Sequence, residues 1–375
     1  MDGSAARPSS PWLAAALRPL SPPPRAPATA GEDLARLNLN ESPWPPSPRA
    51  IEAAAAAIRG ANRYPPPAGD ALSLALGART GSDPSLIVLA GGSDLILHQA
   101  CMITLEAGAS SVFPRPSFPR YQASTAIAGA RAIAVDVTED GRNDVPAMLA
   151  AIAADTRIVF ACTPNGGTGG ALEEAALAAL AAGVPDHLLL LVDEAYAEFS
   201  RAAGGPDAVA VLRRHRQGPW VVSRTFSKAY ALAGMRIGYA ICSGPDVAAA
   251  FAIARPAFPL GAPAIAAAAA ALEDEAHLAM IVRGTAEGVA QLTTGLGALG
   301  LATYPSVGNF VSADLRRPAT PVIAAMQAAG VLVRGLREPG WERWLRISVG
   351  LPEENRRALV ALAAALAAPP PEKPR

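Results

Sequence analysis

The chain has 375 residues and is 51% hydrophobic and 17% charged, with 32 basic and 32 acidic residues that give a formal net charge of zero. This composition is typical of a globular protein large enough for two domains, and without a basic block the chain is not expected to bind nucleic acid. Three scattered cysteines argue against a disulfide framework or a metal site and favour a reducing, cytoplasmic location, and no apolar run reaches the roughly 18 residues of a membrane span.

The first 60 residues are rich in proline and alanine. We expect residues 1–30 to form a flexible arm, and the short apolar stretch at 12–17 leaves a secretory signal as the alternative. Residues 37–48 carry too many prolines for a helix and should run extended over a surface. An alanine-rich helix is predicted at 51–59, ended by Gly60.

From residue 86 onward, short apolar runs alternate with helix-length segments. The runs predicted as strands are 86–90, 111–113, 132–137, 157–162, 188–192, 220–223 and 237–241. The segments predicted as helices include 94–106, 119–127, 145–153 and 172–182. This alternation predicts an α/β fold with a mainly parallel central sheet and helices on both faces.

The pattern changes after residue 263. It is helical to residue 299, and it then predicts strands at 309–313, 331–334 and 344–349 and a last helix at 353–367. We therefore expect a large domain at 61–263 and a smaller α+β domain made from both chain ends, 31–60 and 264–375.

The segment SRTFSKAYALAGMRIGYA at 223–240 carries a lysine, two hydroxyls and an arginine after a predicted buried strand. A lysine that forms an imine needs a pocket that lowers its pKa, and Lys228 is the candidate. The hydroxyls of Thr225 and Ser227 and the guanidinium of Arg236 suit a phosphate dianion. On this segment alone, a solvated lysine at a helix start is an equal alternative.

A second segment, LLLLVDEAYAEF at 188–199, places Asp193 and Glu194 at the carboxyl end of an apolar strand. Ligands of open α/β sheets lie at such strand ends. A buried carboxylate there could keep a pyridine nitrogen protonated, and the phenol of Tyr196 could reach the oxygen of the same ring. The alternative is that Asp193 caps the helix that follows.

Together these residues resemble the fold-type-I pyridoxal phosphate (PLP) aminotransferases, specifically the histidinol-phosphate aminotransferase family. The resemblance extends from about residue 37 to 350, and its most specific element is the SKxxxLAGxRxG pattern at 227–238. It implies that Lys228 binds the cofactor as a Schiff base and moves the proton, that Asp193 pairs with the ring nitrogen and that Tyr196 contacts the 3′-oxygen. It also implies a phosphate site formed by Thr225, Ser227 and Arg236.

Further segments resemble cofactor-binding parts of this family. GGSD at 91–94 opens a helix whose Ser93 and Asp94 amides would face the phosphate, the alternative being a glycine turn capped by Asp94. RPSFPRY at 115–121 implies that Phe118 stacks on the cofactor ring, the alternative being a core aromatic. RYP at 63–65 implies that Tyr64 reaches the cofactor phosphate of a partner subunit, and hence a homodimer with shared active sites.

Three residues are implied on the substrate side. LRISVG at 345–350 matches the arginine that clamps an α-carboxylate, here Arg346. Arg334, in GVLVRGL, matches a position that contacts the substrate phosphate. NES at 40–42 resembles the stretch that closes over the site, which makes Asn40 a candidate.

The chain departs from the family pattern in two places. Where the family has Asn-Asn-Pro-Thr-Gly, residues 165–169 read Asn-Gly-Gly-Thr-Gly, so Gly166 replaces an asparagine that donates to the 3′-oxygen and Gly167 replaces a proline. Asn165 is the candidate to supply the missing bond. The segment 20–33 also lacks the tyrosine that the family places near its substrate.

The resemblance implies a ping-pong transamination with PLP, in which histidinol phosphate is the amino donor and 2-oxoglutarate the acceptor. The alternatives are an aromatic amino-acid aminotransferase, a threonine-phosphate decarboxylase and a PLP-binding protein that has lost turnover. A nucleotide-binding Rossmann domain is disfavoured because its glycine-rich fingerprint is missing near the first predicted strand.

Overall fold

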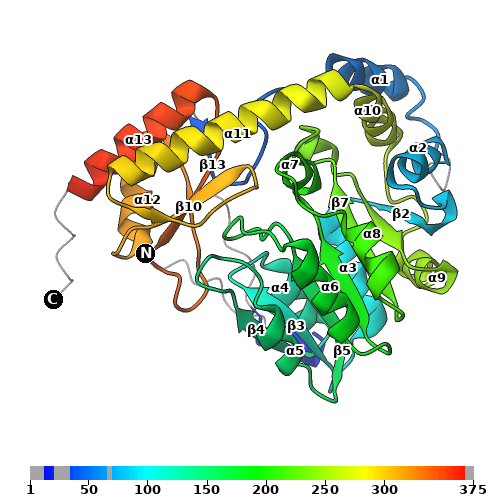
Figure 1. Ribbon diagram of the computed structural model, residues 1–375. Helices are drawn as coiled ribbons and strands as arrows, with labels where there is room; N and C mark the ends of the chain where they lie inside the picture. The colour runs from blue at the N-terminus through cyan, green and yellow to red at the C-terminus, as the bar shows by residue number, and fades with distance from the viewer. Residues whose placement is uncertain (1–11, 21–33, 66–69, 368–375) are drawn as a thin grey trace.

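The computed structural model describes residues 12–20, 34–65 and 70–367 (Figure 1). The rest of the predicted N-terminal arm, and residues 21–33 of the segment without the tyrosine, lie outside these ranges. Within the described arm, the short turn η1 (Ala15–Leu17) packs against α4 (Arg120–Ile127). None of the helices in the described ranges is long and apolar enough to cross a membrane.

The larger part of the structure is built on a seven-stranded sheet. Its strands are β2 (Ile87–Ala90), β3 (Ser110–Arg115), β4 (Arg131–Asp136), β5 (Thr156–Cys162), β6 (Leu189–Asp193), β7 (Trp220–Thr225) and β8 (Gly238–Cys242). They lie in the order β2-β8-β7-β6-β5-β3-β4. The strands from β4 to β7 pair in parallel, whereas β8 runs antiparallel to both of its neighbours. The predicted mainly parallel sheet is therefore confirmed.

Helices cover both faces of this sheet, as buried parallel strands require. Alternate side chains of β5 enter two separate cores, Ile158 and Phe160 one of them and Val159 and Ala161 the other. The first core is covered by α3 (Ser93–Thr104), α4 and α9 (Pro245–Ala254). The second is covered by α2 (Asp70–Thr80), α5 (Val145–Ala150), α6 (Glu174–Gly183), α8 (Ala208–His215) and α10 (Ala262–Glu273).

The smaller part combines residues 35–37 with residues from the stretch 275–367 (Figure 1). Its antiparallel sheet has the strand order β12 (Arg334–Gly335), β13 (Trp344–Ser348), β10 (Phe310–Asp314) and β9 (Ala302–Thr303). A separate pair joins β1 (Ala35–Arg36) in parallel to β11 (Val331–Leu332), so the run predicted as one strand at 331–334 is divided between two sheets. The helices of this part are α11 (Glu275–Ala298), α12 (Ala319–Ala328) and α13 (Pro352–Ala367).

Helix α1 (Pro48–Ile58) packs with the larger part of the structure. Its buried Ala50 and Ala54 join the core of the seven-stranded sheet, and the helix lies along α10. Ala35 and Leu37, earlier in the chain, are buried in the core of the smaller part. Residues 31–60, predicted as one part of the small domain, therefore contribute to two cores: residues 35 and 37 to that of the smaller part, and α1 to that of the larger part.

The two parts meet at the carboxyl ends of β5, β6 and β7. Asp193 at the end of β6 is in register with Ser223 of β7. The small sheet contacts the turn after β5, because Ser312 Oγ of β10 donates to Gly167 O at 2.7 Å and Arg346 Nη1 of β13 donates to Gly166 O at 2.8 Å. A junction at the carboxyl ends of parallel strands is the usual ligand site of such folds.

Candidate active site

Asp193 is 3% exposed, and its carboxylate lies among hydroxyl groups. Its two oxygens accept hydrogen bonds from Tyr121 Oη at 2.8 Å and Ser223 Oγ at 3.1 Å. Burial raises the pKa of Asp193 to about 6, and the hydrogen bonds that the carboxylate accepts offset the effect of burial only in part. The helix that follows, α7 (Ala197–Ala202), has Tyr196 at its N-cap position, so Asp193 is not its cap.

Lys228 lies half-buried in the turn after β7. Its Nζ donates to the backbone oxygens of Leu39 at 3.1 Å and Asn40 at 2.9 Å, and it lies 5.9 Å from the centre of the Tyr196 ring. Burial, followed by the positive charge of Arg346, lowers the pKa of Lys228 to about 7. A substantial fraction of this amine is therefore neutral and nucleophilic near pH 7, unlike that of a solvated lysine.

Asn40 connects Lys228 to a second predicted site residue, Tyr196. Its side-chain amide donates to Tyr196 Oη at 2.9 Å, and its Oδ1 accepts from Ser348 Oγ at 2.7 Å. The φ of Asn40 is +53°, a left-handed conformation that this buried residue keeps while its side chain is held on both sides. Burial raises the pKa of Tyr196 to about 12, so its phenol is protonated and able to donate.

The residues predicted to hold a phosphate lie together where β7 ends and β8 begins. Thr225 Oγ1 donates to Ser227 Oγ at 3.0 Å, and Arg236 Nη1 donates to the same oxygen at 3.3 Å. The guanidinium covers Gly92, since a Cβ at that glycine would lie 2.6 Å from Arg236 Nη2. Within the described ranges, Arg236 forms no ion pair with an acidic side chain; its other hydrogen bond is to Ala233 O.

The predicted Ser93 and Asp94 open helix α3 beside this group. Gly92 is the N-cap residue, with a φ of +89°, and as a glycine it has no side chain with which to cap the first turn. The Asp94 carboxylate accepts two bonds from Arg120, at 2.7 and 2.9 Å, and so does not cap it either. The positive end of the helix dipole is therefore directed toward the space next to Arg236.

These groups fit PLP. A phosphate dianion would find a guanidinium without an acidic partner among the described residues, two hydroxyls and a helix N-terminus. A protonated pyridine nitrogen would supply the cation that the buried Asp193 lacks, and the partly neutral amine of Lys228 could bond to an aldehyde.

The two arginines predicted to bind substrate stand opposite each other on adjacent strands. Arg334 of β12 and Arg346 of β13 are register partners. Arg346 donates to the backbone oxygens of Gly166 and Asn38, at 2.8 and 3.1 Å, while its buried Nε has no hydrogen-bond partner in the described part of the chain. Burial lowers the pKa of Arg346 to about 10, and burial followed by the charge of Arg337 lowers the pKa of Arg334. No acidic side chain of the described residues forms an ion pair with either, so the pair suits an anion.

The Asn-Gly-Gly-Thr-Gly turn uses its asparagine internally. Asn165 Nδ2 donates to Pro116 O at 3.0 Å, and its Oδ1 accepts from the Gly167 amide at 2.7 Å. Gly166 faces open space, because a Cβ there would come no closer than 4.0 Å to Phe118 Cβ. Phe118 is partly exposed and meets Tyr121 edge-on with 6.2 Å between ring centres. In this structure the Asn165 amide is therefore directed to Pro116 O.

Tyr64 lies at the surface, outside this cluster. It is 78% exposed and stacks on the partly exposed Phe258, with ring centres 4.3 Å apart. Pro259, the next residue, approaches the turn before α3, because its oxygen would lie 4.0 Å from a Cβ on Gly91. The predicted contact of Tyr64 with a partner subunit stays a prediction.

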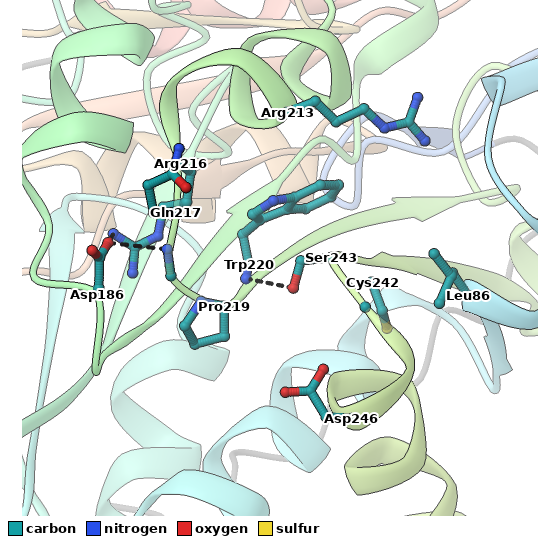
Figure 2. A pocket seen from close by; sticks show the side chains of 12 residues that line it. Leu86, Asp186, Arg213, Arg216, Gln217, Pro219, Trp220, Cys242, Ser243 and Asp246 are labelled. Atoms are coloured by element: carbon teal, nitrogen blue, oxygen red, sulfur yellow. Dashed lines mark hydrogen bonds and ion pairs between the residues drawn. The ribbon is translucent and has the colours of Figure 1, made fainter.

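A pocket of about 550 Å³ opens at the opposite end of the sheet (Figure 2). Trp220, the first residue of β7, is among the residues that line it, whereas Thr225, Ser227 and Lys228 of the predicted site lie at and beyond the other end of that strand. Charges of both signs line it, and Arg216 there donates to Pro185 O and Leu188 O, near the end of α6, at 3.0 and 2.7 Å. We regard this pocket as separate from the candidate active site.

Three residues of the site were not predicted from the sequence. Tyr121 lies in the RPSFPRY segment, in which Phe118 was the predicted aromatic. Ser223 and Ser312 are single serines in otherwise mostly apolar runs, WVVS and FVSA. A hydroxyl in a buried strand that ends at a ligand site is the signal that could have identified these two, since such a group needs a partner.

Comparisons with known proteins agree with this geometry. The family model "Aminotransferase class I and II" matches residues 32–362. The chain is 41% identical over 334 residues to histidinol-phosphate aminotransferase 2 of Pseudomonas aeruginosa, covering 89% of each chain. It is 40% identical over 357 residues to histidinol-phosphate aminotransferase 1 of Thiobacillus denitrificans, covering 95% of this chain and 92% of the relative.

Solved structures extend the comparison to three dimensions. Histidinol-phosphate aminotransferase from Sinorhizobium meliloti, in complex with pyridoxal-5′-phosphate, matches with a TM-score of 0.83 at 30% identity, covering 89% of this chain and 91% of that one. Aspartate aminotransferase from Thermus thermophilus with maleate shares the fold, with a TM-score of 0.78 at 24% identity, covering 89% and 92%. These matches confirm the predicted fold class. The chain belongs to the class I and II aminotransferases, in their histidinol-phosphate aminotransferase family.

Proposed function

We propose that this protein is a PLP-dependent aminotransferase that takes the amino group from histidinol phosphate and passes it to 2-oxoglutarate. The observation that carries the substrate class is the Arg334–Arg346 pair, two opposed guanidiniums without an acidic partner among the described residues. Phosphate and carboxylate are the groups that such forked cations bind. The names of the relatives from Pseudomonas aeruginosa and Thiobacillus denitrificans support histidinol phosphate as the donor.

PLP, when bound, supplies an electron sink for the carbon that carries the amino group. Lys228 would be the covalent anchor and, once released, the base that moves the proton from that carbon to C4′ of the cofactor. Asp193 keeps the ring nitrogen protonated, and Tyr196 donates to the ring oxygen. The remaining proposed cofactor contacts are Ser93, Asp94, Phe118, Asn165, Thr225, Ser227 and Arg236. The Asn165 contact requires its amide to leave Pro116 O.

The two arginines have separate proposed tasks. Arg346 binds the α-carboxylate of the keto acid and of its amino-acid product, and Arg334 binds the phosphate of histidinol phosphate. Because the two residues are register partners, one site can accept both substrates in turn, as a ping-pong reaction requires. Asn40 closes over the site by holding Tyr196 and the small sheet together.

The test measures each half-reaction separately, by the absorbance change of the bound cofactor when one amine is added. Arg334→Ala should lower kcat/KM for histidinol phosphate by about 10- to 100-fold, the value of a hydrogen bond to a charged group, and should affect glutamate less. Arg346→Lys should show the reverse preference. Arg317→Ala, which removes an exposed cation of the small part, is the control and should change neither.

Each rival predicts a different result. If Arg334→Ala leaves histidinol phosphate unaffected while phenylalanine or tyrosine reacts fastest, the protein is an aromatic amino-acid aminotransferase. Release of carbon dioxide from threonine phosphate without an acceptor would identify a decarboxylase. If the protein binds PLP but shows no half-reaction with any amine, it is a PLP-binding protein that has lost turnover.

We also propose a homodimer with shared active sites, located in the cytoplasm. Support for the dimer comes from the exposed stack of Tyr64 on Phe258 near the turn before α3, an aromatic surface of the kind that interfaces bury. The cytoplasmic location rests on the class of biosynthetic enzyme named among the relatives.

A further inference from the structure

Two hydroxyl groups hold Asp193 from opposite sides, and neither is part of the proposed function above. Tyr121, in the first turn of α4, donates to Oδ2 at 2.8 Å, and Ser223 of β7 donates to Oδ1 at 3.1 Å. Each carboxylate oxygen thus has its own donor from a different element. These two bonds, together with one from the Ala195 amide, fix the position and the plane of the carboxylate, which keeps acceptor capacity for another donor.

The Tyr121 ring is held independently of its hydroxyl. It is fully buried, and it stacks on Phe160 with ring centres 4.9 Å apart and planes inclined by 25°. Phe113 and Phe118 pack at 6.1 and 6.2 Å between ring centres. A phenylalanine would satisfy these contacts, so the hydroxyl serves Asp193 rather than the aromatic cluster. Burial raises the pKa of Tyr121 well above its usual range, so the phenol is protonated and donates.

We propose that Tyr121 is a positioning residue which, together with Ser223, holds the Asp193 carboxylate ready for the ring nitrogen of the cofactor. This rests on the role proposed for Asp193. Bonds donated to a carboxylate favour its ionised form, and they oppose the effect of burial, which favours the neutral acid. A neutral acid would have no charge with which to bind a protonated pyridine. By favouring the ionised carboxylate, the two hydroxyls therefore strengthen the binding of the cofactor through its ring nitrogen.

The experiment compares two ligands on the apoprotein. One is PLP and the other is 1-deazapyridoxal phosphate, in which a carbon replaces the ring nitrogen; dissociation constants are measured by absorbance titration. Wild type should prefer PLP. Tyr121→Phe and Ser223→Ala should each weaken PLP by about tenfold or more, as loss of a bond to a charged group does, and leave the affinity for the deaza analogue unchanged. Tyr304→Phe, which removes a hydroxyl that accepts from Trp341 in the small part, should change neither.

Asp193→Asn separates failure of this inference from failure of the proposed site. If Asp193→Asn keeps the wild-type preference for PLP, Asp193 is not the partner of the ring nitrogen and the proposed site is wrong. If Asp193→Asn abolishes the preference while Tyr121→Phe and Ser223→Ala retain it, the positioning role is wrong and the site stands. Equal weakening of both ligands by Tyr121→Phe would show a purely structural role and also overturn the inference. Should Tyr121→Phe fail to fold, Ser223→Ala decides by the same comparison.

Discussion

Opposing effects act on the Lys228 amine. The two backbone oxygens of Leu39 and Asn40 favour the ammonium form, whereas burial and the charge of Arg346 favour the neutral amine. The charges of Glu41 and Asp193 also favour the ammonium form, but the pKa of about 7 lies well below the ordinary value because burial and the arginine have the larger effect. The N-terminal segment therefore orients the amine without removing its reactivity.

The rate at which the apoprotein captures PLP should follow the neutral fraction of Lys228. We expect this rate to rise by about tenfold per pH unit below the pKa and to level off above pH 7. Arg346→Gln removes one of the causes of the low pKa and should move the midpoint upward, whereas Arg317→Gln should not. The measurement is stopped-flow absorbance between pH 5 and pH 10; a wild-type midpoint near pH 10 would contradict the low pKa.

Asp193 should make the apoprotein less stable as the pH rises. Its folded-state pKa of about 6 lies above the ordinary value of 3.8, so the folded state holds the proton more tightly and stability is lost between those two pH values. The loss is on the order of 3 kcal/mol from the size of the shift. Asp193→Asn should flatten the pH dependence of urea unfolding from pH 4 to pH 6 and stabilise the apoprotein at pH 8. Parallel curves for the mutant and wild type would contradict this, and the exposed Asp246→Asn is the control.

At the scale of elements, the turn at 165–169 fastens the two parts of the molecule together. Its carbonyl oxygens at Gly166, Gly167 and Gly169 accept bonds from Arg346 Nη1, Ser312 Oγ and the Val307 amide, at 2.8, 2.7 and 3.1 Å. Ser312 and Arg346 are register partners on β10 and β13. Gly169 has a φ of +89°, and Ser306 fills the place that a side chain would take. The turn thus positions Arg346, the arginine proposed to bind the substrate carboxylate, through backbone atoms.

Gly166 and Gly167 should differ in how well they tolerate replacement by the asparagine and proline that the family has at these positions. Gly166→Asn should leave stability unchanged because its side chain enters open space beside Phe118, and it should slow PLP dissociation by adding a donor near the ring. Gly167→Pro should destabilise the protein by about 1–3 kcal/mol, because it deletes the amide that donates to Asn165 Oδ1. Urea unfolding and cofactor dissociation of both variants are the measurements. A stable Gly167→Pro variant would show that the amide bond is dispensable.

The elements of the large sheet were predictable because each follows from a local pattern. Apolar runs predicted its seven strands to within two residues, since all of these strands except the edge strand β4 are mostly buried. The packing of α1 against the larger part was not predictable. An alanine-rich helix can pack on any flat surface, and its position here is determined by tertiary contacts with α10. Candidate site residues could be named from the sequence where a motif contains them, as at Lys228. Tyr121 was missed because its role comes from the approach of α4 to β6, which no local pattern encodes.

At the scale of the whole molecule, the test of the dimer is complementation. Tyr64→Phe and Lys228→Ala subunits are mixed and allowed to exchange, which is confirmed by mass. If Tyr64 acts across the interface, hybrid dimers contain one site free of both lesions, and activity should exceed that of either mutant alone. Activity equal to the average of the parents would contradict a shared site. Phe258→Ala, which removes the stacking partner of Tyr64, should weaken the dimer in sedimentation experiments.

The unpaired charges of the site also bear on how much folded protein a cell can keep. Asp193, Arg346 and Arg334 are buried or partly buried, and none of them forms an ion pair with a side chain of the described residues, so bound ligands would supply their direct charge partners. A ligand present at a hundred times its dissociation constant adds about 2.7 kcal/mol to stability, a large part of the reserve of an ordinary domain. Scarcity of the vitamin that yields PLP would then lower the amount of this protein in the cell as well as its activity. The chain without cofactor unfolds more often and is therefore degraded sooner by proteases.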